Sequence, residues 1–150
     1  MGLTRRQLLA AAAGGVARAA QYKAGGTKPR TKPPVCLYSK QLANVEYDDL
    51  GKVLRDLGFD GCDLSVEAGG HVLPEHAQAD LVRAVLAVTD AGLDVPIFTT
   101  SITSAGDPNI RLILGYGGFL GVPLFRPGIW KYNGAAEIEA RLAQVQGEIA

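Results

Sequence analysis

Residues 50–67, LGKVLRDLGFDGCDLSVE, decide the fold of this chain because they join an amphipathic helix to a strand through one short turn. Four apolar side chains recur at the spacing of a single helix face: Leu50, Val53, Leu54 and Leu57. Gly58 stands where many helices end in a left-handed turn, and the run from Gly61 to Glu67 then predicts a strand. A helix that leads directly into a strand indicates an α/β fold.

The same alternation extends over residues 35–150. Strands are predicted over four runs: 35–42, 61–67, 95–102 and 122–126. Helical periods separate these runs; one helix begins near Pro74, and Asp107-Pro108 provides a cap and a first-turn proline for the next. The last helix carries four apolar residues at helical spacing: Ile138, Leu142, Val145 and Ile149. The pattern predicts four parallel β/α units.

Four units are half of the eight that close a (β/α)₈ barrel, which typically needs about 250 residues. Four parallel strands cannot close on themselves. An open doubly wound sheet also fits the length. However, the first strand-to-helix junction, residues 40–44, contains no glycine, and the chain has neither of the glycine-rich phosphate-binding motifs. We therefore do not expect nucleotide binding.

The N-terminus has the pattern of an export signal. Arg5 and Arg6 precede a weakly apolar, alanine-rich stretch, and Ala17-Arg18-Ala19 follows as a small-x-small cleavage site. The pattern predicts a twin-arginine signal peptide over residues 1–19, the twin-arginine translocase as a partner, and a periplasmic location. An ordinary amphipathic helix is the alternative, although alanines and glycines leave no apolar stripe. Residues 20–34, rich in Gly, Pro and Lys, predict a flexible linker.

Charge and cysteine content exclude several classes of protein. The chain has 15 basic and 15 acidic residues, and removal of residues 1–19 leaves 12 basic residues against 15 acidic ones. Such a mildly acidic protein is not expected to bind nucleic acid. Outside the signal, no apolar run approaches the roughly 20 residues that a membrane span requires. Cys36 and Cys62 are too few for a disulfide framework, and they are expected to be either buried thiols or one bridge.

Three segments carry a family resemblance: residues 58–65 (GFDGCDLS), 69–75 (GGHVLPE) and 122–128 (VPLFRPG). Together they resemble the xylose-isomerase-like sugar phosphate isomerase/epimerase family, in which exported members with a twin-arginine leader are familiar. The similarity runs from about Val35 to the end. It implies that residues 35–150 are the N-terminal half of a TIM barrel that interconverts a ketose with an aldose or an epimer through an enediolate. Mn²⁺, Mg²⁺ or Zn²⁺ is the usual cofactor.

The chain departs from the family pattern in one respect. The metal ligands of such barrels lie mainly at the ends of strands five to eight, and only four strands are predicted here. No metal ligand of the family can therefore be carried onto a position of this sequence, and no cofactor is expected for these four units alone.

Barrel active sites form at the carboxyl ends of the strands. Four residues near those ends are candidate substrate-binding residues: Glu67, His71, Arg126 and Trp130. His71 either faces the sugar pocket or caps the following helix, and Glu67 either orients His71, binds a hydroxyl, or is an exposed loop acid. Arg126 either clamps a hydroxyl, carboxylate or phosphate, or forms a salt bridge. Trp130 either stacks on a sugar or covers the core. No catalytic residue is assigned.

Two functions remain open. One is an exported sugar or sugar phosphate isomerase/epimerase-like protein without the metal-binding half, inactive by itself. The other is a non-catalytic carbohydrate-binding or assembly module. Under either interpretation, the open edges of half a barrel favour a homo-oligomer.

Overall fold

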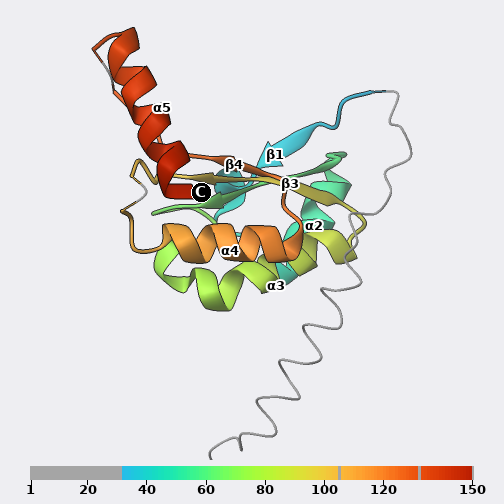
Figure 1. Cartoon of the computed structure of the whole chain (residues 1–150). Helices are drawn as coiled ribbons and strands as arrows, with labels where there is room; N and C mark the ends of the chain where they lie inside the picture. Colours follow the sequence, from blue (N-terminus) through green and yellow to red (C-terminus); the bar gives the residue numbers. More distant parts are fainter. Residues whose placement is uncertain (1–31, 105, 132, 150) are drawn as a thin grey trace, which may run out of the picture.

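The computed structural model describes residues 32–104, 106–131 and 133–149 (Figure 1). The predicted signal peptide and most of the predicted linker lie outside these residues. Four strands alternate with helices in the order β1 (Cys36–Tyr38), α2 (Tyr47–Asp56), β2 (Gly61–Val66), α3 (Ala77–Asp90), β3 (Asp94–Thr100), α4 (Ile110–Leu120), β4 (Leu124–Arg126) and α5 (Ala135–Ile149). Two 3-10 helices, η1 (Ser39–Leu42) and η2 (Pro74–His76), lie in the connections.

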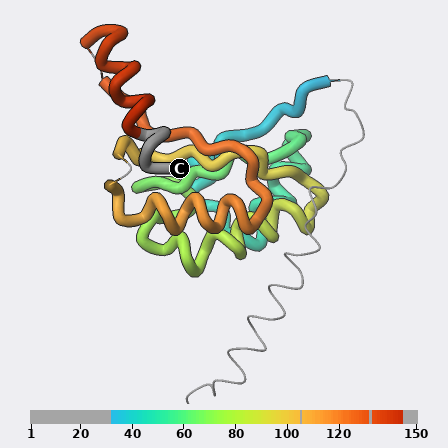
Figure 2. The backbone as a smooth tube through the Cα atoms, viewed as in Figure 1, coloured from blue at the N-terminus to red at the C-terminus, as the bar shows by residue number. Residues whose placement is uncertain are grey.

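The strands form one parallel sheet in the order β1-β2-β3-β4, so the prediction of a four-stranded parallel α/β fold is confirmed. Helices α2, α3 and α4 lie together on one side of this sheet (Figure 1). The tube in Figure 2 shows the chain turning from α4 into β4 and continuing to α5 on the side away from α3. The sheet face opposite the three helices is therefore the face on which a site can open. Among the described residues, no helix is long and apolar enough to cross a membrane.

The core lies between the sheet and the three helices. Alternate residues of β2, namely Cys62, Leu64 and Val66, are fully buried there, because successive side chains of a strand point to opposite faces. The helices contribute Leu50, Leu54, Leu81, Val85, Val88 and Ile113. Leu57, expected on the same helix face as Leu50 and Leu54, is 58% exposed because it lies beyond the last residue of α2.

Two predicted strands are much shorter than expected, and the other two end one or two residues early. The first ends at Tyr38 and not at residue 42, because the hydroxyl of Ser39 accepts the Ser65 N–H (2.9 Å) and the chain then turns into η1. The last begins at Leu124 and not at residue 122, since the preceding Pro123 has no N–H to donate to a neighbouring strand.

Two helices end at glycines, and the helix end predicted at Gly58 is confirmed. Gly58 follows α2 with a φ of +82°, and Gly121 caps α4 with a φ of +73°. Side chains with a Cβ are disfavoured at such angles, which is why glycine stops each helix.

The two cysteines do not form a disulfide bridge. The parallel register pairs Leu37 with Cys62 and Cys36 with Gly61. Cys36 and Cys62 therefore lie on opposite faces of the sheet, and their side chains cannot meet. Burial raises the pKa of Cys62 to about 12.

Candidate functional site

The strand registers bring four polar residues to one end of the sheet, on the face without helices. Tyr38 of β1 is paired with Asp63 of β2, and Thr99 of β3 is paired with Arg126 of β4. Thr99 lies two residues beyond Ile97, the β3 partner of Asp63, so it shares the face of Asp63. The sheet itself therefore positions these side chains at its carboxyl-terminal end.

Asp63 is the buried centre of one polar group. Its Oδ1 accepts a hydrogen bond from the Thr99 hydroxyl (2.6 Å), and its Oδ2 lies 3.4 Å from Nη1 of Arg126. Acidic side chains are rarely buried unless they are paired. Both carboxylate oxygens of Asp63 have such a partner.

Glu67, immediately after β2, is the centre of a second group. Its Oε1 accepts a hydrogen bond from Nζ of Lys40 (2.9 Å) and another from the Tyr38 hydroxyl. Burial alone raises the pKa of Glu67, but the hydrogen bonds from Tyr38 and Lys40 outweigh it, so the pKa is lowered. Burial and the bond to Glu67 raise the pKa of Tyr38 to about 12. Near neutral pH, Glu67 is thus a carboxylate and Tyr38 keeps its proton.

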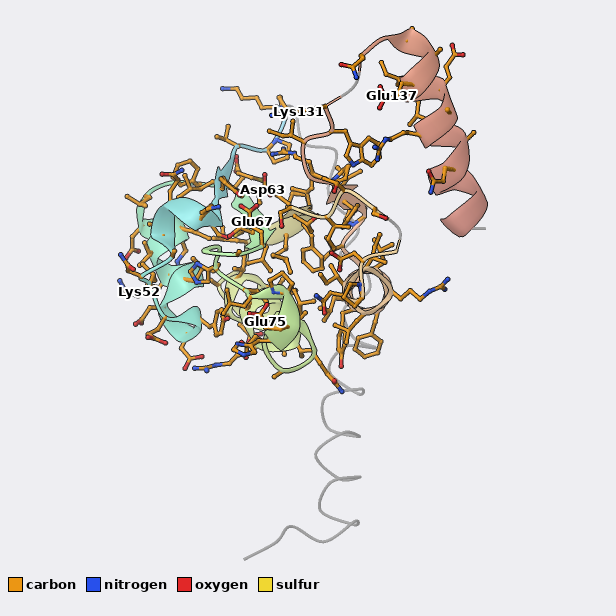
Figure 3. All side chains as sticks on the ribbon, turned by 90° about the vertical axis from the view of Figure 1, so that its left-hand side faces the viewer. Lys52, Asp63, Glu67, Glu75, Lys131 and Glu137 are labelled. Carbon is orange, nitrogen blue, oxygen red and sulfur yellow. The ribbon has the colours of Figure 1, made fainter. Side chains whose placement is uncertain are left out.

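A cavity of about 490 Å³ opens between these groups and the segment after β4. Its lining contains Glu67, Arg126 and Tyr38, four hydroxyl side chains and the turn after β4: Thr99, Thr100, Ser101, Thr103, Pro127, Gly128 and Ile129. Figure 3 shows Asp63 and Glu67 in the upper part of the molecule, away from Lys52 and Glu75. We call this space the strand-end cavity. Two of the four candidate residues, Glu67 and Arg126, line this cavity.

Arg126 fits both interpretations that the sequence left open, because it forms a salt bridge with Asp63 and also lines the strand-end cavity. Glu67 does not orient His71. Its hydrogen bonds go to Tyr38 and Lys40.

His71 lines a different cavity, of about 440 Å³, together with residues 43–47. The Ser65 hydroxyl accepts the backbone N–H of His71 (2.8 Å), and His71 does not line the strand-end cavity. Nδ1 lies 3.3 Å from the Ser39 carbonyl oxygen, which only accepts, so Nδ1 carries the proton. Burial lowers the pKa of His71, and its Nε2 is buried without a hydrogen-bond partner among the described residues.

Trp130 is half-buried and follows the residues that close the strand-end cavity, Gly128 and Ile129. Trp130 itself does not line that cavity. Its Nε1 is shielded from solvent and has no hydrogen-bond partner within the described ranges.

Three further residues of the site, Tyr38, Lys40 and Asp63, were not singled out from the sequence. Asp63 carries the clearest signal, since it is a charged residue inside a strand whose residues are all buried. Tyr38 and Lys40 could not be recognised as site residues from the sequence, because their role depends on the contacts of β1 and η1 with Glu67.

The site does not have the donor set of a metal centre. No three His, Cys, Asp or Glu side chains of the described residues lie close enough to hold a metal ion together. In addition, Asp63 and Glu67 already bind Arg126 and Lys40. The residues present therefore do not fit the divalent metal that the family resemblance implies, and we assign no metal ligand.

Comparisons with known proteins identify no relative: no family model matches the chain, and no curated protein matches it significantly.

Proposed function

We propose that this chain binds a carbohydrate at the carboxyl ends of its parallel strands, as the first four β/α units of an isomerase/epimerase-type barrel. The observation that carries the proposal is the strand-end cavity, in which Glu67, Arg126 and a cluster of hydroxyl side chains meet. Its size of about 490 Å³ lies in the range of small-molecule sites, roughly 300–1,000 Å³.

The chemistry of the lining matches a polyhydroxylated ligand. Each sugar hydroxyl is a donor and an acceptor, so its site must offer both kinds of group. The carboxylate of Glu67 accepts, the guanidinium of Arg126 donates, and the exposed hydroxyl of Ser101 does either. An apolar ligand would cover the donors and acceptors that these groups still have free, at a penalty of about 1–3 kcal/mol for each one left unpaired.

The position of the cavity supports the same proposal. In α/β proteins with parallel strands, ligands bind outside the carboxyl ends of the strands. The strand-end cavity lies there, and Asp63, which binds the lining residues Thr99 and Arg126, belongs to segment 58–65, which carries the family resemblance.

We propose carbohydrate binding only, and we assign no residue to the isomerisation step. Interconversion through an enediolate moves a proton between adjacent carbons and requires a base within reach of both. Glu67 is an ionised carboxylate, but two hydrogen bonds already hold it, so we assign it to hydroxyl binding and name no base.

Titration of the purified chain with pentoses, hexoses and their ketose isomers, followed by amide NMR shifts, tests the proposal. We expect saturable shifts at Thr99 and Ser101. Replacing Glu67 or Arg126 by alanine should weaken binding at least 10-fold, equivalent to about 1.4 kcal/mol. Exposed residues of matched charge, Glu75→Ala and Arg111→Ala, should leave it unchanged. Absence of saturable shifts with every sugar would refute the proposal.

Exchange of sugar protons with deuterated solvent separates the two functions that the sequence left open. Incorporation of deuterium next to the carbonyl group supports an isomerase/epimerase. Binding without incorporation supports the non-catalytic carbohydrate-binding module.

We also propose export by the twin-arginine route, on the strength of Arg5 and Arg6, which lie outside the described residues. Replacing both by lysine should retain the protein in the cytoplasm, whereas Arg18→Lys should not. An unchanged periplasmic yield after the double substitution would contradict this assignment.

A further inference from the structure

Two cations stand at the strand-end cavity, and each is already paired with a carboxylate. Arg126, in the lining, lies 3.4 Å from Asp63, and Nζ of Lys40 lies 2.9 Å from Glu67. The four side chains together carry no net charge. An anion that enters this cavity therefore meets Arg126 and Glu67 in the lining, each with its charge already compensated by a partner, Asp63 or Lys40.

The carboxylate of Asp63 is held in place. Its side chain is 10% exposed, and the Thr99 hydroxyl fixes the oxygen that Arg126 does not use. The Arg126 side chain is 58% exposed, so it is the solvent-accessible member of the pair. Asp63 therefore anchors the guanidinium and neutralises its charge.

The pairing affects neutral and anionic ligands differently. A guanidinium has five N–H donors, and a salt bridge to one carboxylate oxygen leaves others for the hydroxyls of a neutral ligand. A phosphate group, in contrast, needs uncompensated positive charge, and it would approach the carboxylates of Asp63 and Glu67. Like charges brought together in a partly buried site oppose binding and so discriminate between ligands.

We propose that Asp63 is a specificity-determining residue that makes the strand-end cavity accept neutral polyols and reject phosphate monoesters and other anions. The identity of the neutral ligand rests on the proposed carbohydrate binding. The rejection of anions rests only on the pairing of Asp63 with Arg126 and of Glu67 with Lys40.

Inorganic phosphate is the probe that tests this role, because it reports on anion binding without any sugar. In the full chain, Asp63→Asn keeps the shape of the side chain and removes its charge. At one fixed ionic strength, we expect this variant to bind phosphate at least 10-fold more tightly than the wild type, measured by amide shifts at Thr99 and Arg126. Asp49→Asn, at an exposed position of α2, changes net charge equally and should show no gain.

Two further variants make the result specific to the cavity. Adding Arg126→Gln to Asp63→Asn should abolish the gain. If Asp63→Asn does not fold, Glu67→Gln removes a lining carboxylate, releases Lys40 from that pair, and should raise phosphate affinity in the same assay.

Equal phosphate affinity in the wild type, Asp63→Asn and Glu67→Gln would overturn the inference, as would tight phosphate binding by the wild type. A gain in phosphate affinity without any sugar binding would support the role of Asp63 and refute the proposed function. The role of Asp63 and the proposed carbohydrate binding can therefore be refuted independently of each other.

Discussion

Replacing Gly51 by alanine tests how closely α2 and α3 approach each other. Gly51 is buried in α2, and a Cβ at this position would lie 2.2 Å from the backbone oxygen of Ala87 and 2.7 Å from Cβ of Ala91. A backbone oxygen cannot rotate away as a flexible side chain can. The two helices would have to separate to admit one methyl group.

The magnitude follows from two opposing contributions. Alanine in place of glycine stabilises an unobstructed helix interior by about 1 kcal/mol. Overpacking of a close contact destabilises by about 1–3 kcal/mol, and a contact against backbone belongs at the upper end of that range. We therefore expect Gly51→Ala to lower the free energy of unfolding by about 1–2 kcal/mol.

Urea unfolding of the purified chain, followed by circular dichroism, measures this change. Gly115→Ala is the matched control, because Gly115 lies on an exposed face of α4 and no atom lies within 4 Å of its added Cβ. This variant should be more stable than the wild type by up to about 1 kcal/mol. The reasoning is refuted if Gly51→Ala is as stable as the wild type or more stable.

Three other measurements check separate features. Burial lowers the pKa of His71, so the unfolded chain binds its proton more readily; stability should be complete above about pH 6.5 and fall below it. His71→Gln should flatten this decline in urea midpoint, and exposed His76→Gln should not. Cys62, with its raised pKa, should react with a thiol reagent in Cys36→Ser only after unfolding, and rapid reaction in native buffer would contradict its burial. Light scattering should show self-association through the open sheet face, where Leu124 is 57% exposed; a monodisperse monomer would contradict it.

The order of the helices and strands could be predicted from the sequence, because each element depends on the spacing of residues within its own segment. The glycines after α2 and α4 and the apolar face of α2 are visible within single segments. The end of β1 is not, since it depends on a hydrogen bond from the Ser65 N–H to Ser39, 26 positions away. Periodicity within one segment carries no information about such a contact.

The residues of the candidate site could likewise be predicted only in part. Glu67 and Arg126 were predicted because the carboxyl ends of parallel strands meet at one edge of the sheet. Their partners follow from the registers between strands, which bring Tyr38 beside Asp63 and Thr99 beside Arg126. His71 was expected either in the same pocket or as a cap of the following helix, and it lines a different cavity and caps neither η2 nor α3.

The alternation of side chains along β2 has an evolutionary consequence. Cys62, Leu64 and Val66 hold the helices, whereas Asp63 and Glu67 serve the cavity on the other face. Selection for a new ligand can therefore change Asp63 and Glu67 while Cys62, Leu64 and Val66 preserve the folded core. Loss of a single codon here would exchange the two sets and remove both properties in one event.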